Sequence, residues 1–366
     1  MKQALLSVLA ATMAAGSYST TAAAQPAVGA AYTMTNLAAG NAVVVYRRGP
    51  DGALTMAGTV PTGGAGTGAG LGNQGGVVLS DDQRWLYVIN AGSHELTVFA
   101  VNPQGLRWVD KVATGGTQPI SVAASGRLVY VVHAGSDDIS GFRQSAEGTL
   151  SSIPGSARPL SAPGADPAQI GFSPDGRFLI VTEKATNVLS VFPVDDQGVA
   201  GDPVAHASAG ATPFGFAFGK RGQLFVSEAF GGPPALSAVS SYVLQASGGS
   251  LLQVVSPSVT TNQLAACWVV TTTPGRFLYT TNTASHSVSG YAVEPDGSIS
   301  LLDPSGVSAA TPAGPIDAAI TQDGRYLYVL TSGGASISRY RVGGSGALEP
   351  LGTAAVPGGA NGLAVR

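Results

Sequence analysis

The chain has 366 residues with 18 basic and 21 acidic side chains, a net charge of −3 and one cysteine, Cys267. No basic run or patch is present, which argues against a nucleic-acid partner. A single cysteine excludes an intramolecular disulfide, a cysteine-based zinc site and a Cys-x-x-Cys redox motif. The fold must therefore be held by packing alone. We also expect a monomer with no metal and no cofactor, whose partner is a small molecule.

The first 24 residues have the layout of a secretory signal peptide. Lys2 supplies a positive start, residues 4–15 are apolar, and residues 22–24 form an alanine cleavage site before Gln25. The apolar stretch is shorter than the roughly 20 residues that span a bilayer. Gly, Pro or a charge interrupts every later apolar segment. The sequence predicts an exported protein, periplasmic or secreted, with no membrane span.

Residues 25–366 repeat one phrase. Six copies begin roughly 43 to 53 residues apart, a spacing typical of propeller blades rather than of helical repeats. Each copy has an apolar strand, a tight turn with glycine, usually followed by arginine, and a second apolar strand. The copies read GGVVLSDDQRWLYVIN, PISVAASGRLVYVVH, PAQIGFSPDGRFLIVTE, PFGFAFGKRGQLFVSE, ACWVVTTTPGRFLYTTN and PIDAAITQDGRYLYVLT.

A third strand of alternating character follows each copy, and a fourth strand completes a blade. Residues 30–36 look like a second strand without a first, and residues 359–366 look like a first strand without a second. Pairing them makes a seventh blade and leaves no open edge in the ring. The sequence thus predicts an all-β, single-domain, seven-bladed β-propeller over residues 25–366, with four antiparallel strands per blade and the first blade closed by the C-terminal strand.

Antiparallel pairing brings the start of each first strand beside the end of each second strand, at one mouth of the central channel. Glu183 and Glu228 end two apolar second strands in consecutive blades, where an unpaired carboxylate is costly unless it is functional. We expect these two glutamates and Gln169 to be catalytic. The residues expected to bind substrate at the same mouth are His133, Gln74, Asn282, His286, Asp317 and Trp268.

Each of these residues also has a structural interpretation. Polar side chains at strand ends often bond to the backbone of the next loop. His94 and His286 occupy matching Ser-His loops, as a repeated structural feature would, and His133 is either a core histidine or a channel group. A metal site made of these three histidines would draw on blades that are not all adjacent, so no metal site is predicted.

The phrases SPDGRFLIVTE, TPGRFLYTTN and QDGRYLYVLT, together with the split first blade, resemble those of the seven-bladed propeller lactonases. That family includes 6-phosphogluconolactonase and 3-carboxymuconate-lactonizing enzyme, and the resemblance covers the whole mature chain. It implies a lactonase-type hydrolase or a cyclase-like enzyme. YVTN-type propellers share the same phrases. This second resemblance implies an alternative function, a non-catalytic module that binds a ligand or a protein at the same mouth.

The family's active-site phrase is Pro-Arg-His at the start of one first strand, followed one strand later by Glu. Here the stretch reads Asp166-Pro167-Ala168-Gln169, and the later strand ends in Glu183. Because bidentate arginine is the usual means of holding a phosphate, and no replacement cation is evident, the resemblance implies a small neutral or weakly charged lactone. Glu183 and Glu228 would share a water as base and acid, and Gln169 or Asn282 would stabilise the oxyanion.

Overall fold

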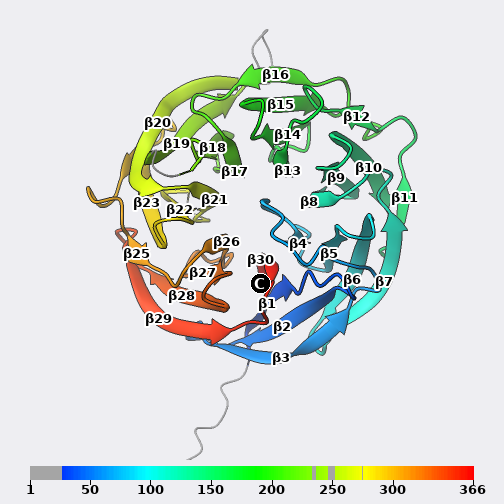
Figure 1. Ribbon diagram of the computed structural model, residues 1–366, viewed down its shortest axis with the longest axis horizontal. Helices are drawn as coiled ribbons and strands as arrows, with labels where there is room; N and C mark the ends of the chain where they lie inside the picture. Colours follow the sequence, from blue (N-terminus) through cyan, green and yellow to red (C-terminus); the bar gives the residue numbers. More distant parts are fainter. Residues whose placement is uncertain (1–26, 233–235, 246–251, 274) are drawn as a thin grey trace, which may run out of the picture.

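The computed structural model describes residues 27–232, 236–245, 252–273 and 275–366. The signal peptide expected over residues 1–24, and the expected start of the mature chain at Gln25, lie outside these residues. In the described part of the chain, no helix is long and apolar enough to cross a membrane. The described residues form a ring of β-strands around a central axis (Figure 1).

Seven blades make up the ring, as the repeats predict, and each blade is an antiparallel meander. In blades three and six the outermost strand is divided into two short segments. From the axis outward, the strands of blades one to three are β30 (Asn361–Val365), β1 (Gly29–Met34), β2 (Ala42–Arg48) and β3 (Leu54–Pro61); β4 (Val77–Leu79), β5 (Trp85–Asn90), β6 (Glu95–Asn102) and β7 (Gly105–Ala113); and β8 (Pro119–Ser125), β9 (Leu128–His133), β10 (Asp138–Gln144), β11 (Leu150–Ser152) and β12 (Arg158–Pro159).

The remaining blades follow the same order. From the axis outward, their strands are β13 (Pro167–Phe172), β14 (Phe178–Glu183), β15 (Val188–Pro193) and β16 (Val204–Ala207); β17 (Pro213–Phe218), β18 (Gln223–Glu228), β19 (Leu236–Leu244) and β20 (Leu252–Leu264); β21 (Ala266–Thr271), β22 (Phe277–Asn282), β23 (Ser287–Val293), β24 (Ile299–Leu301) and β25 (Ala309–Ala310); and β26 (Pro315–Ile320), β27 (Tyr326–Thr331), β28 (Ser336–Val342) and β29 (Leu348–Ala355).

The two ends of the described chain close the ring. Strand β30 pairs antiparallel with β1, with Ala31 opposite Val365. Beyond the strand, Arg48 Nε donates a hydrogen bond to the carbonyl oxygen of Arg366 at 3.0 Å. The predicted closure of the first blade by the C-terminal strand is therefore confirmed, and it removes the free edges that an open propeller would expose.

The aromatic residue in the middle of the repeated second strand has a common role. In four blades it is a buried tyrosine whose hydroxyl donates to the next blade, at the end of its third strand or in the turn after that strand, so each tyrosine links two neighbouring blades. The four hydrogen bonds join Tyr87 to Gln144 Oε1 at 2.7 Å, Tyr130 to Gly198 O at 2.7 Å, Tyr279 to Gly346 O at 2.8 Å, and Tyr328 to Gly52 O at 3.0 Å.

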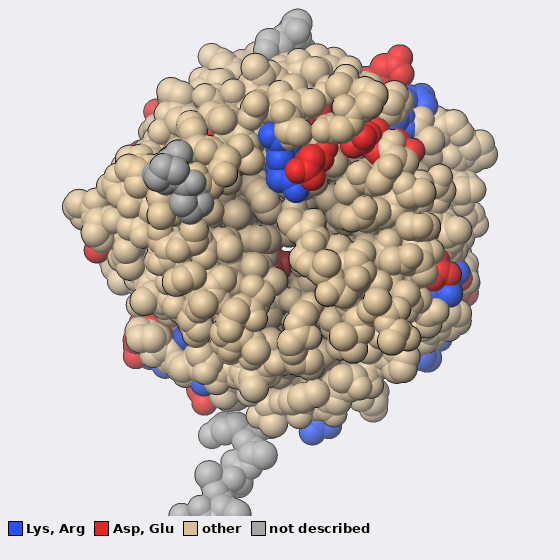
Figure 2. All heavy atoms as spheres, in the orientation of Figure 1, with Lys and Arg blue, Asp and Glu red and all other residues tan. Residues whose placement is uncertain are grey.

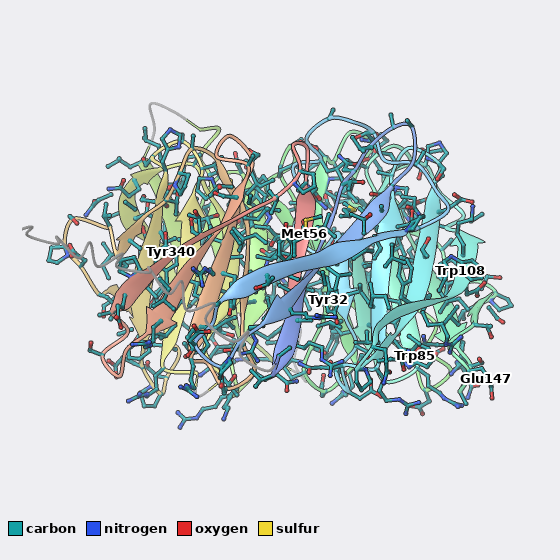
Figure 3. All side chains as sticks on the ribbon, turned by 90° about the horizontal axis from the view of Figure 1, so that it is seen from below. Tyr32, Met56, Trp85, Trp108, Glu147 and Tyr340 are labelled. Carbon is teal, nitrogen blue, oxygen red and sulfur yellow. The ribbon has the colours of Figure 1, made fainter. Side chains whose placement is uncertain are left out.

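The two faces of the ring carry different connections. In the side view of Figure 3, Trp85 and Glu147, which lie beside tight turns, point toward the lower face, which we call the turn face. The second strands end on the opposite face, which we call the loop face. Met56 on β3 and Trp108 on β7 lie on the outer wall with 52% and 48% of their surface exposed. Any site at the predicted mouth must therefore lie on the loop face.

Candidate functional site

The connection between blades one and two enters the central channel. Asn73 Nδ2 donates a hydrogen bond to Ile120 O, and the backbone N–H of Gln74 donates to Ala168 O at 3.0 Å. The side chain of Gln74 bonds the backbone of Val269 twice, from Nε2 to the carbonyl oxygen at 2.9 Å and from the N–H to Oε1 at 3.1 Å. These partners belong to the innermost strands of blades three, four and six. Asn73 and Gln74 therefore lie within the channel.

Gln74 and Gln169 make the same kind of contact with the channel wall. Gln169 Nε2 donates to Phe216 O at 3.1 Å, and its Oε1 accepts from the N–H of Phe216 at 2.7 Å, which satisfies the free edge of blade five. On β17 the residue equivalent to Gln169 is Gly215, which has no side chain to bond the edge of blade six. A Cβ on Gly215 would lie 2.2 Å from Gln74 Oε1. The side chains of Gln74 and Gln169 are thus each bonded to backbone at N and at O.

An apolar cluster lies around this channel segment on the innermost strands. It contains Phe214, Cys267 and Trp268 together with Ala168. The rings of Phe214 and Trp268 are 5.1 Å apart, and Trp268 Nε1 donates to Asn73 O at 2.6 Å. The predicted residue Trp268 therefore contributes its aromatic surface here, while its polar N–H is engaged with the channel segment.

Lys184 is a cation that the sequence analysis missed. Its Nζ donates to Gly72 O at 2.8 Å, lies 3.1 Å from Asp166 Oδ1, and stands 5.1 Å from the centre of the Phe214 ring. The lysine side chain is 11% exposed and that of Asp166 is 60% exposed. Figure 2 shows a group of basic and acidic side chains beside the central opening. The sequence feature that could have identified Lys184 is its position immediately after Glu183, at the end of a second strand.

The carboxylate of Glu183 is buried and hydrogen bonded. It accepts hydrogen bonds from the backbone N–H of Ser161 at 3.1 Å and from the Ser161 hydroxyl. It also accepts from the hydroxyls of Thr186 at 2.8 Å and Ser190 at 2.6 Å. The residue is 0% exposed. Glu183 therefore ties the loop before blade four to the second and third strands of that blade.

Glu228 has an equivalent network in blade five. It accepts from the N–H of Gly210 at 2.8 Å and from the hydroxyls of Ser240 and Ser258, the latter at 2.7 Å. Burial raises the pKa of the Glu228 carboxyl above its ordinary value, and the three hydrogen bonds oppose that shift. Within the described residues, Glu183 and Glu228 share no hydrogen-bond partner. The structure places them in two separate networks.

The same position in other blades holds other polar residues with similar partners. Asn90 Nδ2 donates to Thr97 Oγ1 at 2.9 Å, Asn282 Nδ2 donates to Ser289 Oγ at 2.8 Å, and the hydroxyls of Thr331 and Ser336 are 2.8 Å apart. In blades two, four, five, six and seven the last residue of the second strand bonds a hydroxyl on the third strand, whereas His133 of blade three contacts Asp138. The predicted residue Asn282 belongs to this repeated arrangement, as do Glu183 and Glu228.

The predicted histidines lie in backbone-bonded positions on the loop face. His133 is 0% exposed and its Nδ1 is 2.8 Å from Asp138 Oδ1. His286 Nδ1 accepts from the N–H of Gly314 at 3.2 Å. His94 makes the equivalent contact in its own loop, with the N–H of Gln118 at 2.9 Å. The matching loops therefore share one contact. In the described residues, no three His, Cys, Asp or Glu side chains are grouped to hold a metal ion.

Asp317 is a buried carboxyl on β26, the innermost strand of blade seven. It is 3% exposed, and its Oδ1 accepts from the N–H of Ala318 at 2.7 Å. Burial raises its pKa well above the ordinary value, while hydrogen bonds from the backbone of Ala318 and Leu363 act in the opposite direction. Asp317 therefore favours its neutral form more than an exposed aspartate would.

A family model described as "Lactonase, 7-bladed beta-propeller" matches residues 10–163 and 148–229. The chain belongs to this family. A search among curated protein sequences gave no match.

Solved structures similar to this lactonase-family propeller share its whole ring. A 6-phosphogluconolactonase candidate from Bacteroides uniformis is 21% identical with a TM-score of 0.70, and a protein from Lactobacillus plantarum is 16% identical with a TM-score of 0.75. A periplasmic gluconolactonase from Pseudomonas aeruginosa is 17% identical with a TM-score of 0.68. Each comparison covers 92% of this chain and 99% of the other. At these identities the likeness shows the fold.

The stretch of this lactonase-family chain that resembles the family's active-site phrase has an altered chemistry. Pro167 pairs with Glu183 across the first two strands of blade four. Ala168 is buried and apolar, and Gln169 holds the edge of blade five. Neither residue offers a charge to a substrate. Lys184, one residue after Glu183, supplies the positive charge on this side of the mouth.

Proposed function

We propose that this protein is an exported enzyme that hydrolyses or forms a small, neutral or weakly charged lactone at the loop-face mouth of its central channel. The observation that carries the proposal is the ion pair of Lys184 and Asp166 beside the apolar surface of Phe214 and Trp268. Membership of the lactonase family supports a lactone as the substrate class.

The charge balance of the mouth supports a neutral substrate. Lys184 is already paired with Asp166 at 3.1 Å. A phosphate or several carboxylates would need more cations, ordinarily arginines with two parallel hydrogen bonds. Phe214 and Trp268 are 8% and 4% exposed, so their rings offer a lactone ring a narrow apolar edge beside the ion pair, and few fixed polar groups are needed to orient it.

The pair has the functional groups that lactone hydrolysis requires. The carboxylate of Asp166 accepts a proton from a water molecule whose oxygen bonds to the lactone carbonyl carbon. The ammonium of Lys184 stabilises the negative charge that forms on the carbonyl oxygen. When the ring C–O bond breaks, the leaving alkoxide takes the proton from Asp166, so that one water is consumed and a hydroxy acid is released.

Glu183 has a positioning role in this proposal. Its carboxylate is enclosed by Ser161, Thr186 and Ser190 and has no exposed surface for a substrate. Because it fixes the end of β14, it fixes the backbone from which Lys184 extends. Gln169 and Gln74 also have positioning roles. Their side-chain amides bond the backbone of innermost strands on either side of the apolar cluster.

A panel of aliphatic, sugar and muconate-type lactones, read by a pH indicator with purified protein, tests the proposal. We expect at least one lactone to be turned over, and Lys184→Met and Asp166→Asn to lower kcat/KM by about a hundredfold or more. Lys111→Met is the matched control, because Lys111 also joins a carboxylate, Glu95 at 2.6 Å, and a glycine carbonyl, Gly63 at 2.9 Å. Its turnover should match the wild type.

The alternative is a non-catalytic module that binds a ligand at the same mouth. The observation that favours it is the complete hydrogen bonding of the buried Glu183 and Glu228 carboxylates. Lack of turnover across the panel, with binding of a lactone that Lys184→Met abolishes, would establish this alternative. Equal turnover by the wild type and by Lys184→Met would remove the ion pair from the mechanism.

Export is the part of the proposal that rests on the N-terminal 24 residues. Cell fractionation followed by intact-mass measurement tests it. We expect protein outside the cytoplasm whose mass corresponds to a start at or within a few residues of Gln25. Exported protein that begins at Met1 would contradict the cleavage, and protein confined to the cytoplasm would contradict export.

A further inference from the structure

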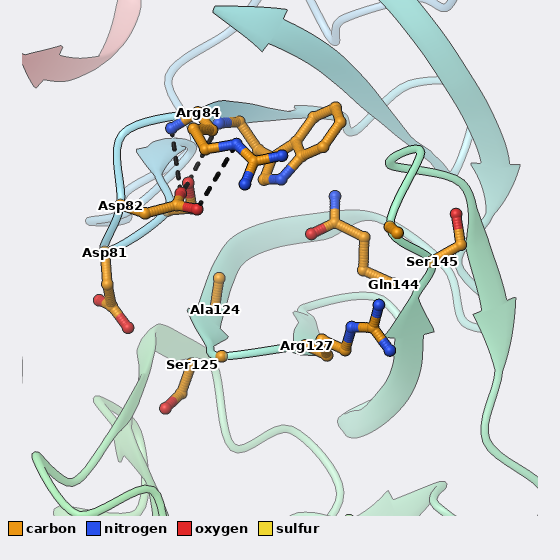
Figure 4. A pocket seen from close by; sticks show the side chains of 12 residues that line it. Asp81, Asp82, Arg84, Ala124, Ser125, Arg127, Gln144 and Ser145 are labelled. Carbon is orange, nitrogen blue, oxygen red and sulfur yellow. Dashed lines mark hydrogen bonds and ion pairs between the residues drawn. The ribbon is translucent and has the colours of Figure 1, made fainter.

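A second cavity lies on the turn face, on the other side of the ring from Lys184. It has a volume of about 260 Å³ and opens between blades two and three. Figure 4 shows Arg84, Gln144 and Arg127 around one space, with Asp81 and Ser125 at its edge. The cavity belongs to the repeated turns, so its residues can be compared with the equivalent residues of the other blades.

Arginine recurs after the tight turn in five blades, and four of these arginines lie over the aromatic ring of the next residue. The distances from the guanidinium carbon to the ring centre are 5.8 Å for Arg84 and Trp85, 5.7 Å for Arg177 and Phe178, 5.2 Å for Arg276 and Phe277, and 5.5 Å for Arg325 and Tyr326. In blade three, Arg127 is followed by Leu128. Arg127 is therefore the turn arginine without an aromatic partner.

The turn of blade three also lacks the usual aspartate. Asp82, Asp175 and Asp323 each precede a turn arginine by two residues and accept a hydrogen bond from its backbone N–H. In blade three that position is Ser125. Among the described residues, the guanidinium of Arg127 has no hydrogen-bond or ion-pair partner. Within the described residues, a full positive charge thus borders the cavity without an ion-pair partner of its own.

One wall of the cavity is firmly held. Gln144 is 3% exposed, its Oε1 accepts from the Tyr87 hydroxyl at 2.7 Å, and its Nε2 donates to Gly148 O at 3.3 Å. Trp85 packs so closely on Gly148 that a Cβ there would lie 2.3 Å from the indole ring. These two groups give the cavity one fixed wall, whereas the exposed side chains of Arg127 and Asp81 would lose conformational freedom when a ligand binds.

The remaining polar groups point to the rest of the ligand. Asp81 lines the cavity and, within the described residues, accepts no hydrogen bond and forms no ion pair. The hydroxyl of Ser125 is likewise without a hydrogen bond there. The carboxylate of Asp81 suits a hydroxyl donor, and Arg84 adds a second guanidinium whose contact with Asp82 is a long 3.8 Å. Anion recognition and hydroxyl recognition are therefore combined in one small cavity.

We propose that this cavity binds a small hydroxy-carboxylate, at a site separate from the mouth of the channel. The ligand carboxylate bonds to the guanidinium of Arg127, for which two parallel hydrogen bonds are the preferred geometry. Hydroxyl groups of the ligand donate to Asp81 and bond to Ser125. The volume of about 260 Å³ limits the ligand to a molecule smaller than most drugs.

Isothermal titration of the purified protein with D-gluconate tests the proposal, with glucitol as the probe that has hydroxyls but no carboxylate. We expect gluconate to bind and glucitol to bind at least tenfold more weakly. Arg127→Gln should weaken gluconate binding at least tenfold. Arg177→Gln is the matched control, since Arg177 follows the same kind of turn but is stacked on Phe178 and faces Asp175, and it should bind within twofold of the wild type.

Gluconate binding to the Lys184→Met variant distinguishes this cavity from the mouth of the channel. Gluconate binding that survives Lys184→Met and is lost in Arg127→Gln supports the proposal. Binding lost in Lys184→Met and kept in Arg127→Gln would place the ligand at the mouth and overturn it. Equal loss in Arg127→Gln and Arg177→Gln, or no heat of binding at millimolar gluconate, would also overturn it. Circular dichroism of each variant shows whether the fold is retained.

Discussion

Gln74 occupies the space that the absent side chain of Gly215 leaves at the channel wall. Its Oε1 stands 2.2 Å from the position that a Cβ on Gly215 would take, and its amide satisfies both backbone groups of Val269. A residue from the connection between blades one and two thereby completes the inner wall between blades five and six. The centre of the ring is held by contacts across the channel as well as between neighbouring blades.

Gly215→Ala should destabilise the protein by about 1–3 kcal/mol, because the added methyl group meets Gln74 and the backbone oxygen of Cys267 in a packed channel. Urea denaturation measures the change. Gly358→Ala is the control, since its Cβ would meet nothing within 4 Å. The double variant Gly215→Ala with Gln74→Ala should be less destabilised than the sum of the single variants. Additive effects would show that the two residues are not coupled.

Asp317→Asn should change how stability depends on pH. The unfolded carboxyl ionises near 3.8, whereas burial delays ionisation in the folded protein to a higher pH. The folded state therefore binds more protons between these two values, and the wild type should lose stability as pH rises through the folded pKa. Each unit of pKa difference corresponds to about 1.4 kcal/mol.

Asp317→Asn should not lose stability in this way. The free energy of unfolding of the variant should therefore increase relative to that of the wild type as pH rises from 4 to 7. Denaturant titrations at several pH values measure the difference. Asp303→Asn, at an exposed turn, is the control, because its carboxyl pKa is lowered by hydrogen bonds from Ser305. A constant difference between wild type and Asp317→Asn across this range would contradict the buried-carboxyl argument.

Glu183→Gln and Glu228→Gln form a matched pair. Each removes a buried carboxylate that accepts hydrogen bonds from serine hydroxyls and a backbone N–H. Both should lower the free energy of unfolding by about 1.5–3 kcal/mol. Turnover should fall far more in Glu183→Gln, by about a hundredfold through displacement of Lys184, because Lys184 follows Glu183 whereas Ala229 follows Glu228.

Kinetics under conditions where both variants remain folded separate the two effects. A larger change in kcat than in KM for Glu183→Gln is expected if the glutamate positions Lys184. Equal losses of turnover in the two variants would assign Glu183 a purely structural role, and undiminished turnover in Glu183→Gln would remove it from the mechanism.

Cys267 should react slowly with thiol reagents in the folded protein. The thiol is 6% exposed, and burial raises its pKa to about 12, so little thiolate exists at neutral pH. Labelling with a chromogenic disulfide at pH 8 measures the rate, and protein unfolded in denaturant serves as the fast control. Rapid labelling of folded protein accompanied by loss of turnover would identify Cys267 as a functional nucleophile.

The sequence by itself determined the number of blades and the way the ring closes. Turn glycines, apolar second strands and alternating third strands are local patterns, and each local pattern specifies one blade. The incomplete segments at the two ends could satisfy their backbone groups only by pairing, as β1 and β30 do. The face on which Glu183 and Glu228 end their strands followed from antiparallel geometry alone.

The tertiary structure decided what those polar residues contact. Gln74 bonds Val269, 195 residues away in the sequence, and Lys184 bonds Gly72, 112 residues away. The repeated pattern carries no signal for such pairs, because they depend on how the connection between blades one and two fills the channel. Glu183 and Glu228 looked like isolated carboxylates in the sequence for a different reason. Their hydroxyl partners, Ser190 and Ser240, are brought to them by the pairing of the second strand with the third.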